Sequence, residues 1–180
     1  FSNGLDPNMF LDKSENEIRE NFTIVIESAA KLFFLPIPLI VVINGHCMGA
    51  GSVFALYGDY RFMVDKKARL GFPEALVGMT FPAGAAMYLQ EVVGVANARD
   101  LLFTGKALKG PEAKEIGLVD EVYPIEEIYT KAYTLAEKIA ELPPEASSGV
   151  KLSFRESYRT VIGELKKKEI HIAVKIITGK

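Results

Sequence analysis

The sequence predicts an α/β fold in which a mixed core is followed by a helical region. Two patterns favour this class: strand-like apolar runs and glycine turns come early, whereas stretches with helical apolar spacing come late. Composition agrees, because 180 residues with 49% hydrophobic content and a net charge of −2 can bury one sizeable core. We therefore predict an α/β core over residues 1–124 and a C-terminal helical region over residues 125–180.

The elements follow from local signals. Ser14 and Glu17 form a capping box, and apolar residues then recur at helical spacing until Pro36, so a helix is expected over about 15–34. The continuous apolar run 37–43 suits a parallel strand covered on both faces. The further elements predicted are a glycine turn, a helix through about Tyr57, a strand over 60–64, helices over 82–93 and 96–103, a short helix bracketed by Pro111 and Gly117, a strand over 118–122, a helix over 125–142 and a final helical stretch.

Charge and residue counts exclude several classes of protein. The near-neutral balance argues against nucleic-acid binding, and the basic run 166–168 is interpreted as a solvated helix face. A single cysteine, Cys47, forms no internal disulfide and indicates a reducing compartment, while His46 and His171 are too few for a metal site. Prolines interrupt the longest apolar stretch, residues 32–43, so no membrane-spanning helix is expected.

The glycine-rich turn Gly45–Ser52 is the first candidate site. It follows an apolar run and precedes a helix, so its backbone N–H groups and the helix dipole suit an anion. Phe54 occupies the third glycine position of a dinucleotide fingerprint, which makes nucleotide binding a weak interpretation; a purely structural turn stays open. An oxyanion hole is favoured, with a second donor from the glycine turn in residues 1–6.

Glu74 is the candidate proton carrier. It lies among apolar residues in the segment 70–78, and burial there would raise its pKa and make it a usable base. The alternative is a solvated glutamate that caps the next turn. His46 and Cys47 are interpreted as structural rather than catalytic, since neither has a recognisable partner at a suitable spacing.

Taken together and in order, these segments resemble the crotonase superfamily, the enoyl-CoA hydratase/isomerase family. The segments that match are Phe1–Asp6, Asn44–Gly51, Gly71–Glu74, Phe103–Lys106, Glu112–Ala113 and Gly117–Val122. The resemblance implies a spiral core of repeated ββα units and an acyl-CoA thioester as ligand. It also implies a homotrimer or hexamer, and we expect an N-terminal part of the natural protein to precede Phe1.

The resemblance assigns roles to residues. The thioester oxygen would lie between the N–H groups of Leu5 and Ala50, where Ala50 stands at a position that is usually glycine. The family's hydratases use two glutamates, and here the first position is Val53 and the second is Glu74. The remaining substrate-binding positions implied are Asn3, Gly4, Gly49 and Phe72, and no metal ligand is implied.

Loss of one carboxylate bears on the reaction, because hydration needs a group that valine cannot replace, whereas moving a double bond needs only one base. The pattern resembles the mitochondrial type of Δ3,Δ2-enoyl-CoA isomerase in β-oxidation. In the peroxisomal type the base lies near residues 80–84, which contain no carboxylate here. Isomerisation of 3-enoyl-CoA to 2-trans-enoyl-CoA is therefore predicted.

Two alternatives stay open, a hydratase that uses Glu74 alone and a CoA-binding or oligomer-forming protein without catalysis. No cofactor is expected beyond the coenzyme A of the substrate. The resemblance fits a cytoplasmic protein if the source is bacterial, and a mitochondrial or peroxisomal one otherwise. Acyl-chain length is not determined by these motifs.

Overall fold

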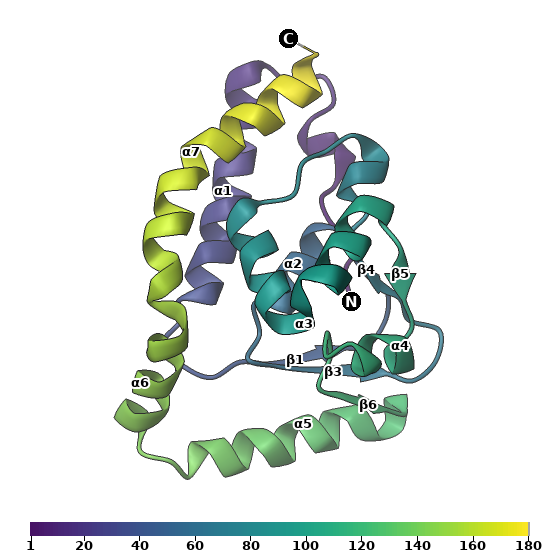
Figure 1. The fold of residues 1–180 in the computed structure, drawn as a ribbon, viewed down its shortest axis with the longest axis vertical. Coiled ribbons are helices and arrows are strands. Elements are labelled where there is room, and N and C mark those ends of the chain that lie inside the picture. The colour runs from purple at the N-terminus through teal and green to yellow at the C-terminus, as the bar shows by residue number, and fades with distance from the viewer. Residues whose placement is uncertain (180) are drawn as a thin grey trace.

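Two small sheets enclosed by helices form the fold of residues 1–179, the part of the chain that this computed structural model describes (Figure 1). The elements in chain order are η1 (Pro7–Met9), α1 (Glu15–Phe33), β1 (Ile40–Ile43), β2 (Cys47–Met48), α2 (Ala50–Leu56), β3 (Tyr60–Val64), β4 (Leu70–Gly71), η2 (Glu74–Val77), α3 (Ala83–Thr104), β5 (Ala107–Leu108), α4 (Gly110–Glu115), β6 (Glu121–Tyr123), α5 (Ile125–Ala140), α6 (Pro144–Arg155) and α7 (Ser157–Thr178). The α/β class predicted from the sequence is confirmed.

The first sheet is parallel and has the order β1-β3-β6, with Ile40 opposite Tyr60 and Phe62 opposite Glu121. Strand β3 is the predicted strand over 60–64. Strand β1 begins at Ile40 rather than at residue 37, because Pro38 lacks the N–H that a ladder requires and Ile37 is 54% exposed. Only Ile43 of β1 is fully buried, so this strand is less covered than its sequence indicated.

The second sheet has the order β2-β4-β5, in which β2 and β4 are parallel and β4 and β5 are antiparallel. Each strand has two residues, which is too short to produce a periodic signal in the sequence. Ser2 forms a parallel bridge with Cys47, so the N-terminal turn joins the edge of this sheet. The two glycine turns that the sequence separates are thereby adjacent.

The helices follow their local signals closely. Ser14 and Glu17 form the predicted capping box of α1. The two helices predicted over 82–93 and 96–103 together make up α3, and the predicted break between them lies at Gly94, whose φ of 78° and ψ of 156° are not helical. Gly117, at φ 76°, follows α4 as predicted, but strand β6 begins only at Glu121.

The helical region packs onto the core. Helix α5 lies against β1 and β3, and α7 runs beside α1 and α3 (Figure 1). A small apolar cluster between α1 and α7 contains Ile18, Phe22, Ile170, Ala173 and Val174. The division between residues 124 and 125 stays a prediction.

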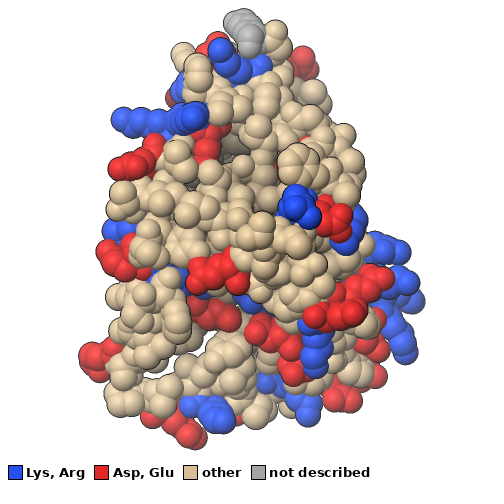
Figure 2. Space-filling model, viewed as in Figure 1, with Lys and Arg blue, Asp and Glu red and all other residues tan. Residues whose placement is uncertain are grey.

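Acidic and basic side chains lie interspersed on the face of the molecule seen in Figure 2. Among residues 1–179, no helix is long and apolar enough to cross a membrane. The same residues contain no group of three or more histidine, cysteine, aspartate or glutamate side chains that could hold a metal ion.

Candidate active site

A cavity of about 500 Å³ lies among α1, α2, α7 and the segment around Glu74. Its walls are mainly apolar side chains such as Phe22, Val25 and Phe54. The residues predicted from the sequence that line it are Asn3, Gly4, Leu5, Gly49, Ala50, Val53 and Glu74. Segments as far apart in the chain as Asn3 and Glu74 therefore meet in one cavity.

The N-terminal glycine turn, residues 1–6, contacts the turn Gly45–Ser52 at the N-terminus of helix α2. The N–H of Met48 donates to Ser2 O at 2.9 Å, and the N–H of Ser2 donates to His46 O at 2.9 Å. A Cβ on Gly4 would lie 3.1 Å from Met48 O and 3.5 Å from the backbone nitrogen of Ala50. With φ at 95°, Gly4 also has a conformation that side chains disfavour, so glycine is needed here for two reasons.

Ala50 is the first residue of α2, and Gly49, at φ 56°, is its N-cap. Among the described residues, the non-glycine positions with positive φ are Asp12 and Lys67, so alanine at position 50 imposes no strain of this kind. Within residues 1–179 neither the Ala50 N–H nor the Leu5 N–H donates a hydrogen bond. Leu5 and Ala50 both line the cavity, and their N–H groups are free to serve as the donors that an oxyanion hole requires.

Glu74 begins the short helix η2 and faces the same turns. Its Oε1 lies 3.7 Å from where a Cβ on Gly49 would be. Its Oε2 is buried and has no hydrogen-bond partner among residues 1–179. Burial raises the pKa of Glu74 above its ordinary 4.5, and a backbone hydrogen bond opposes that rise.

Val53 and Phe72 have different positions. Val53 lines the cavity and is 7% exposed, so the apolar replacement of the first glutamate faces the same space as Glu74. Phe72 is 1% exposed but is not among the lining residues; it packs edge-to-face on Phe81 with ring centroids 5.3 Å apart. Phe72 therefore packs in the protein interior, outside the cavity wall, and holds the segment that leads to Glu74 in place.

Sequence reasoning missed a second carboxylate in the cavity, Glu169 on α7. Its Oε1 accepts a hydrogen bond from the Ala83 N–H, at the start of α3, at 2.6 Å. Burial raises the pKa of Glu169, and the backbone N–H groups of Ala83 and Gly84 oppose that rise. Glu169 follows the basic run 166–168, and a charged run carries no signal that one member turns inward.

Neither of the other two candidates, Cys47 and His46, lines this cavity. Cys47 is fully buried, and burial raises the pKa of its thiol to about 11, so the thiolate is disfavoured. His46 is exposed and is not among the residues that line the cavity.

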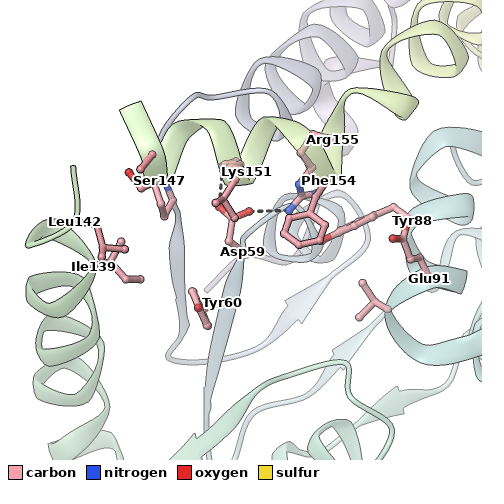
Figure 3. Close-up of a pocket in the computed structure, with 14 residues that line it drawn as sticks. Asp59, Tyr60, Tyr88, Glu91, Ile139, Leu142, Ser147, Lys151, Phe154 and Arg155 are labelled. Carbon is pink, nitrogen blue, oxygen red and sulfur yellow. Dashed lines mark hydrogen bonds and ion pairs between the residues drawn. The ribbon is translucent and has the colours of Figure 1, made fainter. Parts of the chain in front are cut away.

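A second cavity, of about 630 Å³, lies between α3, the end of α5 and α6 (Figure 3). Its floor holds Asp59, whose Oδ1 is 2.9 Å from Arg155 Nη2 and whose Oδ2 is 2.8 Å from Lys151 Nζ. Asp59 Oδ2 also accepts from the Leu39 N–H at 2.8 Å. Both oxygens of Asp59 therefore have partners, and we interpret the residues around it as a structural ion cluster rather than a reactive site.

Comparison with known proteins identifies relatives over nearly the whole chain. The family model described as "Enoyl-CoA hydratase/isomerase" matches residues 1–178. YngF of Bacillus subtilis (strain 168), which carries the family's name, is 32% identical over 160 residues, or 89% of this chain and 61% of YngF. The enoyl-CoA isomerase/hydratase fer4 of Mycosarcoma maydis is 29% identical over 153 residues, or 85% of this chain and 56% of fer4.

Solved structures give the same result. Human mitochondrial Δ3-Δ2-enoyl-CoA isomerase superposes with a TM-score of 0.92 at 26% identity, covering 99% of this chain and 69% of that one. Enoyl-CoA hydratase from Bacillus anthracis gives 0.80 at 29% identity, covering 94% and 66%. The chain spans about three fifths of the length of YngF, 61%, and the two structures carry names of different reactions.

Proposed function

Because the chain belongs to the enoyl-CoA hydratase/isomerase family, we propose that it converts 3-enoyl-CoA to 2-trans-enoyl-CoA with Glu74 as the single base. One observation carries this proposal. A carboxylate with an unpartnered buried oxygen faces an apolar cavity beside two free backbone N–H groups, and the neighbouring wall position is Val53. This arrangement offers one group that can carry a proton and one place for negative charge.

In the proposed reaction the thioester oxygen accepts hydrogen bonds from the Leu5 and Ala50 N–H groups. Glu74 removes a proton from C2, and the electron pair of that C–H bond is delocalised onto the thioester oxygen as a dienolate. Protonated Glu74 then returns the proton to C4, while the C2–C3 double bond forms and the C3–C4 double bond is lost. Each oxyanion donor contributes on the order of 10²–10³ in rate.

Isomerisation is favoured over hydration by Val53, which lines the same cavity as the proposed base. Hydration needs a group to orient and deprotonate water as well as a proton source for the α-carbon. Val53 can do neither, and Glu169 is engaged by the Ala83 N–H. The high TM-score with the human isomerase supports the same choice.

The test is Glu74→Gln, which keeps the shape of the side chain but cannot carry the proton. We expect turnover of a 3-enoyl-CoA, followed by the ultraviolet absorbance of the conjugated product, to fall about 10²–10⁴-fold. Glu164→Gln, at an exposed position on α7, is the matched control and should keep full activity. Undiminished turnover by Glu74→Gln would contradict the proposal.

A second measurement addresses the hydratase alternative. Incubation of the wild-type chain with crotonyl-CoA should give little 3-hydroxyacyl product, and appreciable product would favour hydration. Binding of acyl-CoA without turnover of any enoyl substrate would instead support a non-catalytic protein.

We also propose that the reaction uses no cofactor beyond the coenzyme A of the substrate, since one carboxylate and two N–H groups suffice for it. Association of copies as a trimer or hexamer is proposed as well. The exposed apolar side chains Leu76, Val77 and Phe103, at 66%, 71% and 80% exposure, support association. Light scattering of the chain in solution would test it.

A further inference from the structure

Ser52 lies directly beneath the candidate oxyanion hole, although no part of the proposed reaction uses it. It is in the first turn of α2, two residues after Ala50, and is 0% exposed. Its hydroxyl oxygen lies 2.7 Å from Cys47 O and 2.7 Å from Gly71 O. A serine hydroxyl has one proton, so this is a three-centre hydrogen bond shared between two carbonyl groups.

The two carbonyl groups belong to neighbouring parallel strands. Cys47 is in β2 and Gly71 is in β4, and each lies at or next to the end of its strand. Gly71 O also accepts the N–H of Gly49 at 3.1 Å. The Ser52 hydroxyl therefore joins the first turn of α2 to the carboxyl ends of both strands.

The chain leads from the end of β2 to the proposed oxyanion donor and from the end of β4 to the proposed base. Strand β2 continues through Gly49 to Ala50, whose N–H is a proposed oxyanion donor. Strand β4 continues through Phe72 and Pro73 to Glu74, the proposed base. The distance between donor and base is set where these two backbones separate, and Ser52 bridges them at that point.

We propose that Ser52 is a positioning residue, whose buried hydroxyl fixes the Ala50 N–H relative to the Glu74 carboxylate. This inference rests on the proposed function. The backbone bonds here tie Gly49 to Gly71 O and the N–H groups of Ser52 and Val53 to Gly49 O, and the Ser52 hydroxyl adds the side-chain bond that joins the first turn of α2 to both strand ends. A displacement near 1 Å between reacting groups costs about 10²-fold in rate.

The experiment compares Ser52→Ala with Ser52→Cys, whose thiol is a weaker donor of similar size, and with Val64→Ala, a buried change in β3 outside the cavity. We expect Ser52→Ala to lower kcat about 10–100-fold with KM within about threefold of wild type, because the lost interaction acts in the transition state. Ser52→Cys should be intermediate. Val64→Ala should keep kcat even where its thermal stability matches that of Ser52→Ala.

A spectroscopic measurement separates positioning from folding. A 3-ketoacyl-CoA loses its C2 proton readily, and its enolate absorbs in the near ultraviolet, so the bound enolate reports directly on the oxyanion donors. Ser52→Ala should form roughly tenfold less enolate at saturation, while its affinity for a saturated acyl-CoA stays within about threefold. Equal enolate in both proteins, or an equal kcat loss in Val64→Ala, would overturn the inference.

The two proposals can fail separately. If the wild type isomerises no 3-enoyl-CoA, the proposed function fails, but the enolate absorbance still tests whether Ser52 positions the donor. If Glu74→Gln loses activity and Ser52→Ala does not, only the role of Ser52 is refuted.

Discussion

Glu74 and Asp59 are carboxylates that line two different cavities within residues 1–179, and their surroundings are opposite. Asp59 has two cations and a backbone N–H on its oxygens, and the side chains of Lys151 and Arg155 are each 3% exposed. Glu74 has no ion-pair partner among residues 1–179, and its Oε2 has no hydrogen bond. The cavity around Glu74, where the carboxylate has no cationic partner, is therefore a better candidate for chemistry than the cavity around Asp59.

The physical reason lies in what the protein does with each charge. Around Asp59 the charge is neutralised, which holds α6 against the start of β1 and β3. Arg155 adds to this by stacking over Phe33 and Tyr88, with its central carbon 4.1 Å and 4.3 Å from the ring centroids. Around Glu74 no cation pairs with the charge and burial outweighs one backbone hydrogen bond, so the carboxylate is costly to ionise and can hold a proton.

The largest effects should come from replacing Glu74 and Asp59 by their neutral isosteres, glutamine and asparagine. Glu74→Gln should remove activity by the 10²–10⁴-fold given above and leave the fold intact. Asp59→Asn should instead destabilise the fold by about 3–5 kcal/mol, because it strands Lys151 and Arg155 as buried cations. Chemical denaturation of both variants checks this; an Asp59→Asn protein as stable as wild type would refute the structural role of the cluster.

A smaller effect should appear in the pH dependence of activity. Since the pKa of Glu74 is raised and the base must be ionised, kcat/KM should climb roughly tenfold per pH unit until the pH passes that raised pKa, and then level off. The limb should therefore lie above the ordinary carboxyl value of 4.5. Glu169→Gln shows which of the two cavity carboxylates titrates. If the pH-dependent rise in kcat/KM disappears in this variant, the titration belongs to Glu169, whatever the change in maximal rate.

The smallest effect concerns stability. A carboxyl whose folded pKa is raised contributes stability that is present below its unfolded pKa and is lost as pH rises through the folded pKa. Glu74→Gln should therefore be more stable than wild type at neutral pH, with no gain at acidic pH. Urea denaturation at two pH values measures this, and a variant less stable than wild type at neutral pH would speak against an unpaired Glu74.

Local signals predicted the helices well because their causes are local. The capping box at Ser14 and Glu17 and the glycine stop at Gly117 formed where their chemistry required them. The two-residue strands β2, β4 and β5 were missed, since pairing partners far along the chain define them rather than any periodicity. The break predicted between the helices over 82–93 and 96–103 is also local in cause, since Gly94 within α3 has non-helical φ and ψ.

By itself the sequence determined the α/β class, the family, the candidate oxyanion turn and the identity of the candidate base. These depend on residue types at short spacings, which a linear pattern can hold. Only the tertiary structure decided that Ala50 is unstrained, that Phe72 lies outside the cavity wall, and that Glu169 and Ser52 lie at the site. Burial and pairing of a charge depend on which distant segments surround it, and that is fixed only when the chain has packed.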